Sequence, residues 1–132
     1  MNFKNKTILI TGGTGSLGNS IAKKLLTEDE CSKVIIFSRD EWKQSQMLEL
    51  DPIFRSAKIR YFLGDVRDKY RLKRAFHEVN YIIHTAALKQ VPAAEYNPTE
   101  FIKTNVIGAM NIIDASIDAG VEKVIALSTD KA

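Results

Sequence analysis

The sequence TILITGGTGSLG, residues 7–18, decides the fold of this 132-residue chain. It opens with a β-rich run at 7–11 and passes through a cluster of glycines. Apolar residues at helical spacing then follow from Leu17 to Leu26. This order predicts a helix that begins directly at the carboxyl end of a buried strand.

The spacing of the glycines indicates what this turn binds. Gly13, Gly15 and Gly18 satisfy G-x-G-x-x-G, and Gly12 with the last two satisfies G-x-x-G-x-x-G. Glycine lets the backbone approach a pyrophosphate, and the N–H groups of a helix N-terminus attract that anion. We therefore expect a dinucleotide site; a purely structural turn is the alternative, and the lack of a following Lys-Ser/Thr pair disfavours a triphosphate-binding loop. The candidate residues of the turn are Gly12, Thr14, Gly15, Ser16, Leu17 and Gly18.

The same alternation of strand and helix continues along the whole chain. Continuously apolar strands are typical of parallel sheets that are covered by helices on both faces. The pattern therefore predicts an α/β fold, a Rossmann-type doubly wound parallel sheet with strand order 3-2-1-4-5. It places residues 1–132 in one domain that stops after its fifth strand. Strands are expected at 7–11, 34–37, 59–63, 81–84 and 124–127, and helices at 17–26, 41–50, 68–76 and 99–119.

Composition excludes several classes of protein. A hydrophobic fraction of 45% and a charged fraction of 27% are ordinary for a globular domain. The single cysteine, Cys31, excludes an internal disulfide framework, favours the cytoplasm and makes no metal site with two distant histidines. No apolar stretch approaches the roughly 20 residues that cross a membrane. A net charge of +3, spread along the chain, gives little reason to expect nucleic acid as a partner.

The choice of cofactor is set near the end of the second strand, about 20 residues beyond the glycine turn. An acidic residue there would accept hydrogen bonds from the ribose 2′-hydroxyl of NAD. Here Ser38 and Arg39 occupy that place, and Lys43 follows one turn later. A hydroxyl donor and a guanidinium fit a 2′-phosphate, so the pattern favours NADP, while Asp40 keeps NAD as the minority alternative. A solvated surface pair of Arg39 and Lys43 is the other alternative.

Asp65 and Val66 follow the third strand and are further cofactor candidates. In a fold of this kind Asp65 can meet the adenine amino group. A helix N-cap at Asp65 or Asp68 is the alternative, and it is the better interpretation for Asp68. We expect His84, which closes a buried strand, to be a hydrogen-bonded core histidine. Trp42 is expected to pack against its helix, and covering the edge of the adenine is the alternative.

Short motifs and three longer stretches of this chain are shared with a known family. They are 11–18, 64–66, Ala86-Ala87 and Asn105 and, among the longer stretches, 37–41, 84–98 and 125–132. The short motifs resemble those of extended short-chain dehydrogenases/reductases. The longer stretches resemble, more narrowly, the UDP-N-acetylglucosamine 4,6-dehydratases of bacterial nonulosonic-acid and capsule pathways, above all the inverting members of pseudaminic acid synthesis.

This resemblance implies a chemistry and its residues. Such enzymes hold NADP tightly, oxidise C4 of UDP-N-acetylglucosamine, remove the C5 proton, lose the C6 hydroxyl as water and return hydride to C6. Asp130 matches the acid for the leaving hydroxyl, Lys131 the base for C5, and Thr129 the hydroxyl that binds the C4 hydroxyl. Lys89 matches a residue that reaches cofactor or substrate, and Ala86-Ala87 matches cofactor contacts. A solvated chain end is the alternative for Asp130 and Lys131.

The family also needs a Tyr-x-x-x-Lys motif on the helix after the fifth strand, and a region that binds uridine diphosphate. Neither lies within these 132 residues. We therefore expect little or no turnover from this chain alone, as the cofactor-binding part of a longer, homo-oligomeric enzyme. A fifth strand left at the sheet edge would favour self-association. Two alternatives stay open: another extended epimerase or reductase, and a non-catalytic NADP-binding module.

Overall fold

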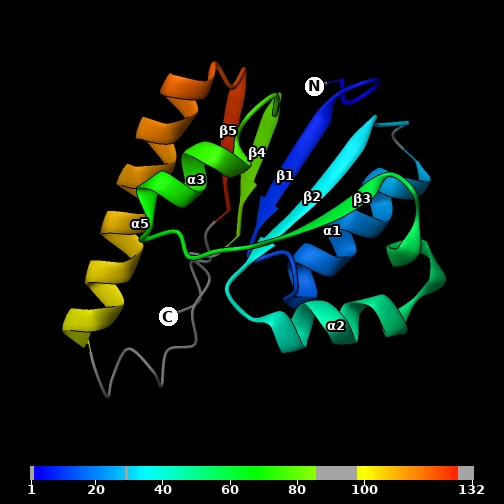
Figure 1. Cartoon of the computed structure of the whole chain (residues 1–132), viewed down its shortest axis with the longest axis horizontal. Coiled ribbons are helices and arrows are strands. Elements are labelled where there is room, and N and C mark those ends of the chain that lie inside the picture. The colour runs from blue at the N-terminus through cyan, green and yellow to red at the C-terminus, as the bar shows by residue number, and fades with distance from the viewer. Residues whose placement is uncertain (1, 29, 86–97, 128–132) are drawn as a thin grey trace.

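The computed structural model describes residues 2–28, 30–85 and 98–127. Its centre is a parallel five-stranded sheet with the order β3-β2-β1-β4-β5, which confirms the predicted topology (Figure 1). The strands are β1 (Thr7–Thr11), β2 (Lys33–Ser38), β3 (Ile59–Leu63), β4 (Tyr81–His84) and β5 (Lys123–Ala126). The helices are α1 (Ser16–Thr27), α2 (Glu41–Leu50), the 3-10 helix η1 (Pro52–Arg55), α3 (Lys69–Ala75) and α5 (Pro98–Ala119).

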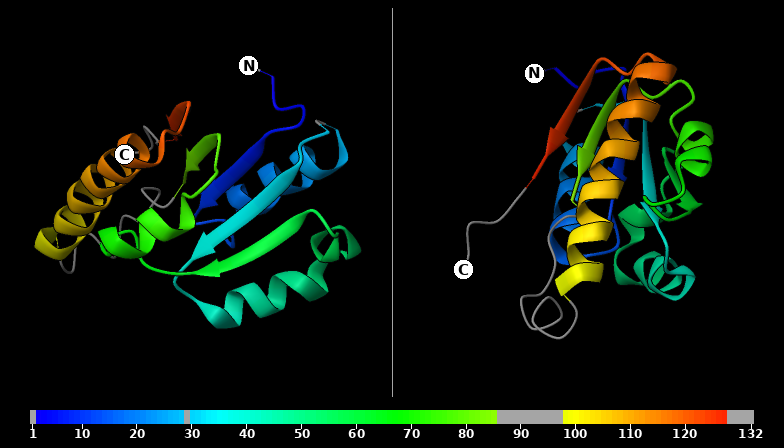
Figure 2. Two further views of the ribbon diagram at one scale, coloured as in Figure 1. Left: turned by 45° about the horizontal axis from the view of Figure 1, so that its top comes forward. Right: turned by 90° about the vertical axis from the view of Figure 1, so that its left-hand side faces the viewer.

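Alternate residues of the central strands build two separate cores. Ile8 and Ile10 of β1 pack with α1, α2 and η1, whereas Leu9 between them packs with α3 and α5. Because successive side chains of a strand point to opposite faces, a strand that is covered on both faces is apolar throughout. Helices α3 and α5 lie side by side on the second face (Figure 2).

The register of the strands brings their carboxyl ends to one edge of the sheet. Thr11, at the end of β1, pairs with Phe37 of β2 on one side and with His84 of β4 on the other. The strand order therefore reverses at β1. Open α/β sheets bind their ligands in the crevice outside the carboxyl ends of the strands at such a switch point. This places the residues that follow β1, β2 and β4 around a single crevice.

Helix α1 lies directly against the glycine turn that precedes it. Gly12 has a φ of 68°, in the left-handed region that glycine adopts without strain, and its N–H donates to the carbonyl of Phe37 at 2.8 Å. A Cβ atom at position 18 would lie 2.5 Å from the Cα of Gly13 and 2.8 Å from the carbonyl oxygen of Gly12. These are backbone atoms that cannot rotate away. The hydrogen at Gly18 is therefore what allows α1 to start so close to β1.

The expected elements agree with the observed ones to within one residue at each end. The sequence patterns do not predict η1, which Asp51 caps by accepting a hydrogen bond from the N–H of Ile53 at 3.0 Å. Phe54 of η1 is buried in the first core. The expectation that Trp42 packs against its helix is wrong, because 67% of this residue is exposed. In the described part of the chain, no helix has both the length and the apolar character for crossing a membrane.

Strand β5 lies at one edge of the sheet formed by the described strands, as expected. Helix α5, which precedes it, carries a row of large apolar residues that are each 51% to 73% exposed. Their spacing of four, three and four residues puts them on one face of the helix. The residues of this apolar stripe are Val106, Met110, Ile113 and Ile117.

The substitution Gly18→Ala should destabilise the fold by roughly 1–3 kcal/mol, because the added methyl group meets backbone atoms. Urea denaturation followed by circular dichroism measures the loss. Gly15→Ala is the matched control, since a Cβ there would lie 3.5 Å from the oxygen of Gly12, an ordinary contact. A Gly18→Ala chain as stable as the unsubstituted one would contradict the close packing.

Candidate functional site

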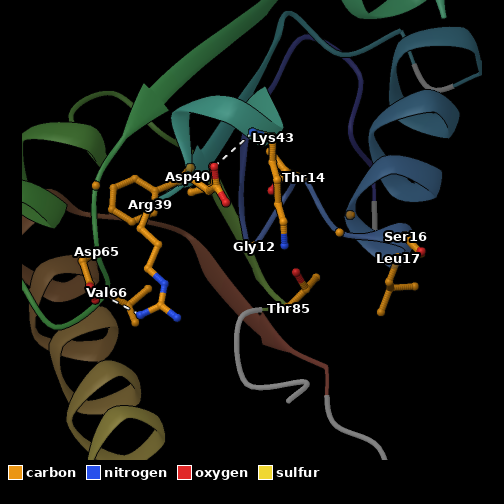
Figure 3. Close-up of a pocket in the computed structure, with 15 residues that line it drawn as sticks. Gly12, Thr14, Ser16, Leu17, Arg39, Asp40, Lys43, Asp65, Val66 and Thr85 are labelled. Atoms are coloured by element: carbon orange, nitrogen blue, oxygen red, sulfur yellow. Dashed lines mark hydrogen bonds and ion pairs between the residues drawn. The ribbon is translucent and has the colours of Figure 1, made fainter. Parts of the chain in front are cut away.

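A cavity of about 360 Å³ opens at the carboxyl ends of the strands, between the glycine turn and the segments that follow β2 and β3 (Figure 3). This volume lies in the range of small-molecule and cofactor sites. The structure brings together around it every predicted cofactor residue that it describes. They are Gly12, Thr14, Gly15, Ser16, Leu17, Gly18, Ser38, Arg39, Asp40, Lys43, Asp65 and Val66.

Three further lining residues were not singled out from the sequence: Phe37, Gly64 and Thr85. Each lies near or just past the carboxyl end of a strand, and that position is the signal that could have found them. The remaining predicted site residues lie outside the described residues. They are the cofactor or substrate candidates Ala86, Ala87 and Lys89, and the catalytic candidates Thr129, Asp130 and Lys131.

One end of the cavity is built from the N-terminus of α1. The helix begins at Ser16, and the residue before it, Gly15, makes no side-chain cap. The first turn also carries no acidic residue. The first N–H groups of a helix have no partner inside the helix, and the helix dipole makes this end positive. The arrangement suits a pyrophosphate.

The opposite wall comes from the end of β2 and the start of α2. Ser38 is buried against the cavity, and the side chains of Arg39 and Lys43 extend into it from that wall (Figure 3). Asp40 accepts a hydrogen bond from the backbone N–H of Lys43 at 3.1 Å and so N-caps α2. Asp40 is the acidic residue that could accept hydrogen bonds from the ribose of NAD, and one of its carboxylate oxygens is therefore already used by the helix.

Asp65 is held by arginines. Its Oδ1 accepts from the backbone N–H of Arg67 at 2.9 Å, and its Oδ2 lies 2.9 Å from Nη2 of Arg67 and 3.9 Å from Nη1 of Arg39. Partial burial raises the pKa of the carboxyl, but the hydrogen bonds and charge of Arg67, with the charge of Arg39, outweigh burial and leave the pKa below its ordinary 3.8. Asp68 N-caps α3, accepting from the N–H of Arg71 at 3.0 Å. The cap interpretation is therefore confirmed for Asp68 and wrong for Asp65.

A buried polar network joins β1 to β4 beside the cavity. Nδ1 of His84 lies 2.6 Å from Oγ1 of Thr11, and the N–H of Thr85 donates to the same Oγ1 at 3.1 Å. The hydroxyl of Thr85 donates to the carbonyl of Thr11. His84 is 4% exposed, so the prediction of a hydrogen-bonded core histidine is confirmed. Thr85 lines the cavity and is fixed in place by this network.

The chemistry of the described cavity favours an anionic ligand. Helix N–H groups stand at one end, Arg39 lies toward the other, and Lys43 lies beside the glycine turn, whose backbone leaves room for close approach (Figure 3). Among the described residues, no three His, Cys, Asp or Glu side chains are grouped so that they could hold a metal ion. The cavity is therefore suited to a phosphate-bearing molecule.

A glycine turn at a helix N-terminus, placed at the switch point of a parallel sheet, defines a dinucleotide-binding domain of the Rossmann type. The family model described as polysaccharide biosynthesis protein matches residues 8–132. The chain belongs to this family.

Known proteins resemble the chain over nearly all of its length. UDP-N-acetylglucosamine 4,6-dehydratase (inverting) of Campylobacter jejuni serotype O:23/36 is 58% identical over 98% of this chain and 38% of that protein. UDP-glucose 4-epimerase of Rickettsia massiliae is 47% identical, again over 98% of this chain and 38% of that protein. The crystal structure of DesIV, a dTDP-glucose 4,6-dehydratase from Streptomyces venezuelae with NAD and TYD bound, has a TM-score of 0.78 at 27% identity, over 89% of this chain and 38% of that one. The predicted resemblance is confirmed, and the chain spans 38% of the length of these proteins.

The substitution Arg67→Ala should raise the pKa of Asp65. Burial raises this pKa, and the substitution removes the side-chain hydrogen bond and the positive charge of Arg67 that lower it. The pKa of Asp65 is lower in the folded chain than in the unfolded chain. Ionised Asp65 therefore stabilises the fold at any pH above the unfolded-state pKa, and this stabilisation is lost as the pH falls through the folded-state pKa. The substituted chain should therefore lose stability at a higher pH on acidification. A carboxyl NMR titration measures the pKa, with Arg74→Ala, an exposed arginine of α3, as control. An Asp65 pKa that Arg67→Ala leaves unchanged would contradict this assignment.

Proposed function

We propose that the chain is the cofactor-binding part of a cytoplasmic nucleotide-sugar 4,6-dehydratase that uses NADP and acts on UDP-N-acetylglucosamine. The observation that carries the proposal is the cavity, where the N-terminus of α1 faces the donors Ser38, Arg39 and Lys43. The 58% identity to the Campylobacter jejuni dehydratase supports the substrate. Because the chain spans 38% of that relative, the activity is proposed for a longer protein that carries this chain.

The preference for NADP over NAD follows from charge. A phosphate monoester accepts hydrogen bonds and carries nearly two negative charges at neutral pH, so its site must supply donors and cations. Arg39 is well placed for this role, because 59% of its side chain is exposed and its 3.9 Å separation from Asp65 is a loose pairing. The capping role of Asp40 weakens the case for NAD. DesIV holds NAD, which makes NAD the competitor to compare.

The proposed reaction removes one water from the sugar without net oxidation. The nicotinamide cofactor, when bound, would supply the hydride acceptor and donor. Asp130 is proposed to protonate the leaving C6 hydroxyl, and Lys131 to take the proton from C5. Thr129 is proposed to hydrogen-bond the C4 hydroxyl, with Lys89 and Ala86-Ala87 beside the cofactor. Return of a proton to the opposite face of C5 would invert that centre.

A UDP-sugar 4-epimerase is the second candidate, favoured by the 47% identity to the Rickettsia massiliae protein. An epimerase leaves the C6 hydroxyl in place, and it needs no acid for that group; the Asp130-Lys131 pair therefore favours the dehydratase. Mass spectrometry distinguishes them, using UDP-N-acetylglucosamine and a protein of the relatives' length that carries this chain. A product lighter by one water supports the dehydratase, and an isomer of unchanged mass would establish the epimerase instead.

The substitution Arg39→Ala should weaken NADP binding about 10- to 100-fold, the loss expected for a charged hydrogen bond. NAD binding should change little, since NAD lacks the 2′-phosphate. Isothermal titration calorimetry of the chain with each dinucleotide measures both affinities. Lys58→Ala, which removes one positive charge from an exposed position outside the cavity, is the matched control. Equal losses of affinity for NAD and NADP would contradict the proposal that Arg39 binds the 2′-phosphate.

We also propose that the chain self-associates through the apolar stripe of α5 and the neighbouring edge strand β5, with a second copy as the partner. Ile117→Glu should then shift sedimentation toward monomer, because burying an unpaired carboxylate is unfavourable. Leu50→Glu is the matched control, since Leu50 is an apolar residue of α2 that is 65% exposed, against 73% for Ile117. Monomeric sedimentation of the unsubstituted chain at high concentration would count against the proposal.

A further inference from the structure

The side chain of Gln44 links the cavity wall to the sheet behind it. Gln44 belongs to α2 and is 8% exposed, an unusual degree of burial for an amide. Its Nε2 donates to Oγ of Ser38 at 3.0 Å and to the backbone carbonyl of Phe62 at 3.3 Å. A carbonyl oxygen can only accept, so the group that faces Phe62 is the NH₂. The orientation of the amide is therefore fixed by β3.

This orientation determines what Ser38 can do. The hydroxyl oxygen of Ser38 accepts one proton of the Gln44 amide, so one of its lone pairs is used. Within the described residues, no hydrogen bond is donated by that hydroxyl, and Ser38 lines the cavity. Its proton is thus available to a ligand in the cavity. Ser38 can therefore donate a hydrogen bond into the cavity, while one lone pair of its oxygen accepts from Gln44.

We infer that Gln44 is a positioning residue for cofactor selectivity: it presets Ser38 as a donor toward an acceptor-only group, the adenosine 2′-phosphate. The inference rests on the proposed function. A phosphate only accepts, whereas the ribose 2′-hydroxyl of NAD both accepts and donates. A serine that already accepts one hydrogen bond from the protein, and whose proton is available, therefore suits the phosphate better. Arg39 and Lys43 line the same cavity and add the positive charge that the phosphate requires.

The test compares adenosine 2′,5′-bisphosphate with AMP by calorimetry, because this pair isolates the 2′-phosphate. Gln44→Glu keeps the shape, and its ionised carboxylate can only accept, so it draws the Ser38 proton away from the cavity. The bisphosphate should bind about tenfold or more weakly, and AMP nearly as before. Gln46→Glu adds the same charge at an exposed position of α2 and is the matched control. Gln44→Met, which removes the donor at similar volume, covers the case in which Gln44→Glu does not fold.

A double-mutant cycle with Ser38→Ala separates positioning from a general effect on the fold. If Gln44 acts through Ser38, the Gln44 substitutions should cost much less bisphosphate affinity in the Ser38→Ala chain. Equal losses with and without Ser38, or equal losses for bisphosphate and AMP, would overturn the inference while the preference for NADP stands. An unsubstituted chain that binds bisphosphate and AMP equally would overturn both this inference and the proposed cofactor.

Discussion

The close approach of helix α1 to the turn before it is the constraint on which the site depends. A hydrogen at Gly18 faces the backbone of Gly12 and Gly13, where a Cβ would come within 2.5 Å of the Cα of Gly13. With no side chain between them, the first N–H groups of α1 stand at the end of β1 and face the cavity. Displacing the helix would remove the anion-binding end as well. This part of the site is made of backbone N–H groups, so its geometry is determined by how α1 packs against β1 and the glycine turn.

The charges around the cavity follow one arrangement: acidic groups are occupied by local partners, and donors are left for a ligand. Asp40 is engaged by the backbone at the start of α2, and Asp65 is engaged by Arg67. Arg39 has only a loose contact with Asp65, and Ser38 accepts from Gln44. Within the described residues, a negatively charged ligand would therefore meet hydrogen-bond donors that no protein acceptor engages closely.

Much of the fold could be predicted because the apolar periods of its strands and helices differ and glycines or prolines end them. Short or mixed elements were missed for physical reasons. η1 (Pro52–Arg55) is too short to show a period, and its signal is the Asp51 cap. Trp42 was placed wrongly because the buried positions of α2 are Gln44 and Met47, one of them polar, so hydrophobicity does not mark its inner face. The cavity residues were found from motifs, but the role of Gln44 depends on a contact with a carbonyl of β3, which no local pattern contains.

At the centre of the sheet β1 pairs with β4, and the network of Thr11, His84 and Thr85 joins these two strands at their carboxyl ends. The cavity is lined from both sides of β1, by Ser38 at the end of β2 and by Thr85 just past the end of β4. A dinucleotide bound in the cavity would contact residues on both sides of β1 and so hold the two halves of the sheet together. Because a ligand that binds the folded state alone stabilises it by RT ln(1 + [L]/Kd), tight retention would make the cofactor a structural component. The stability of the folded chain would then depend on the concentration of its cofactor, and a shortage of cofactor would lower the fraction of chain that is folded.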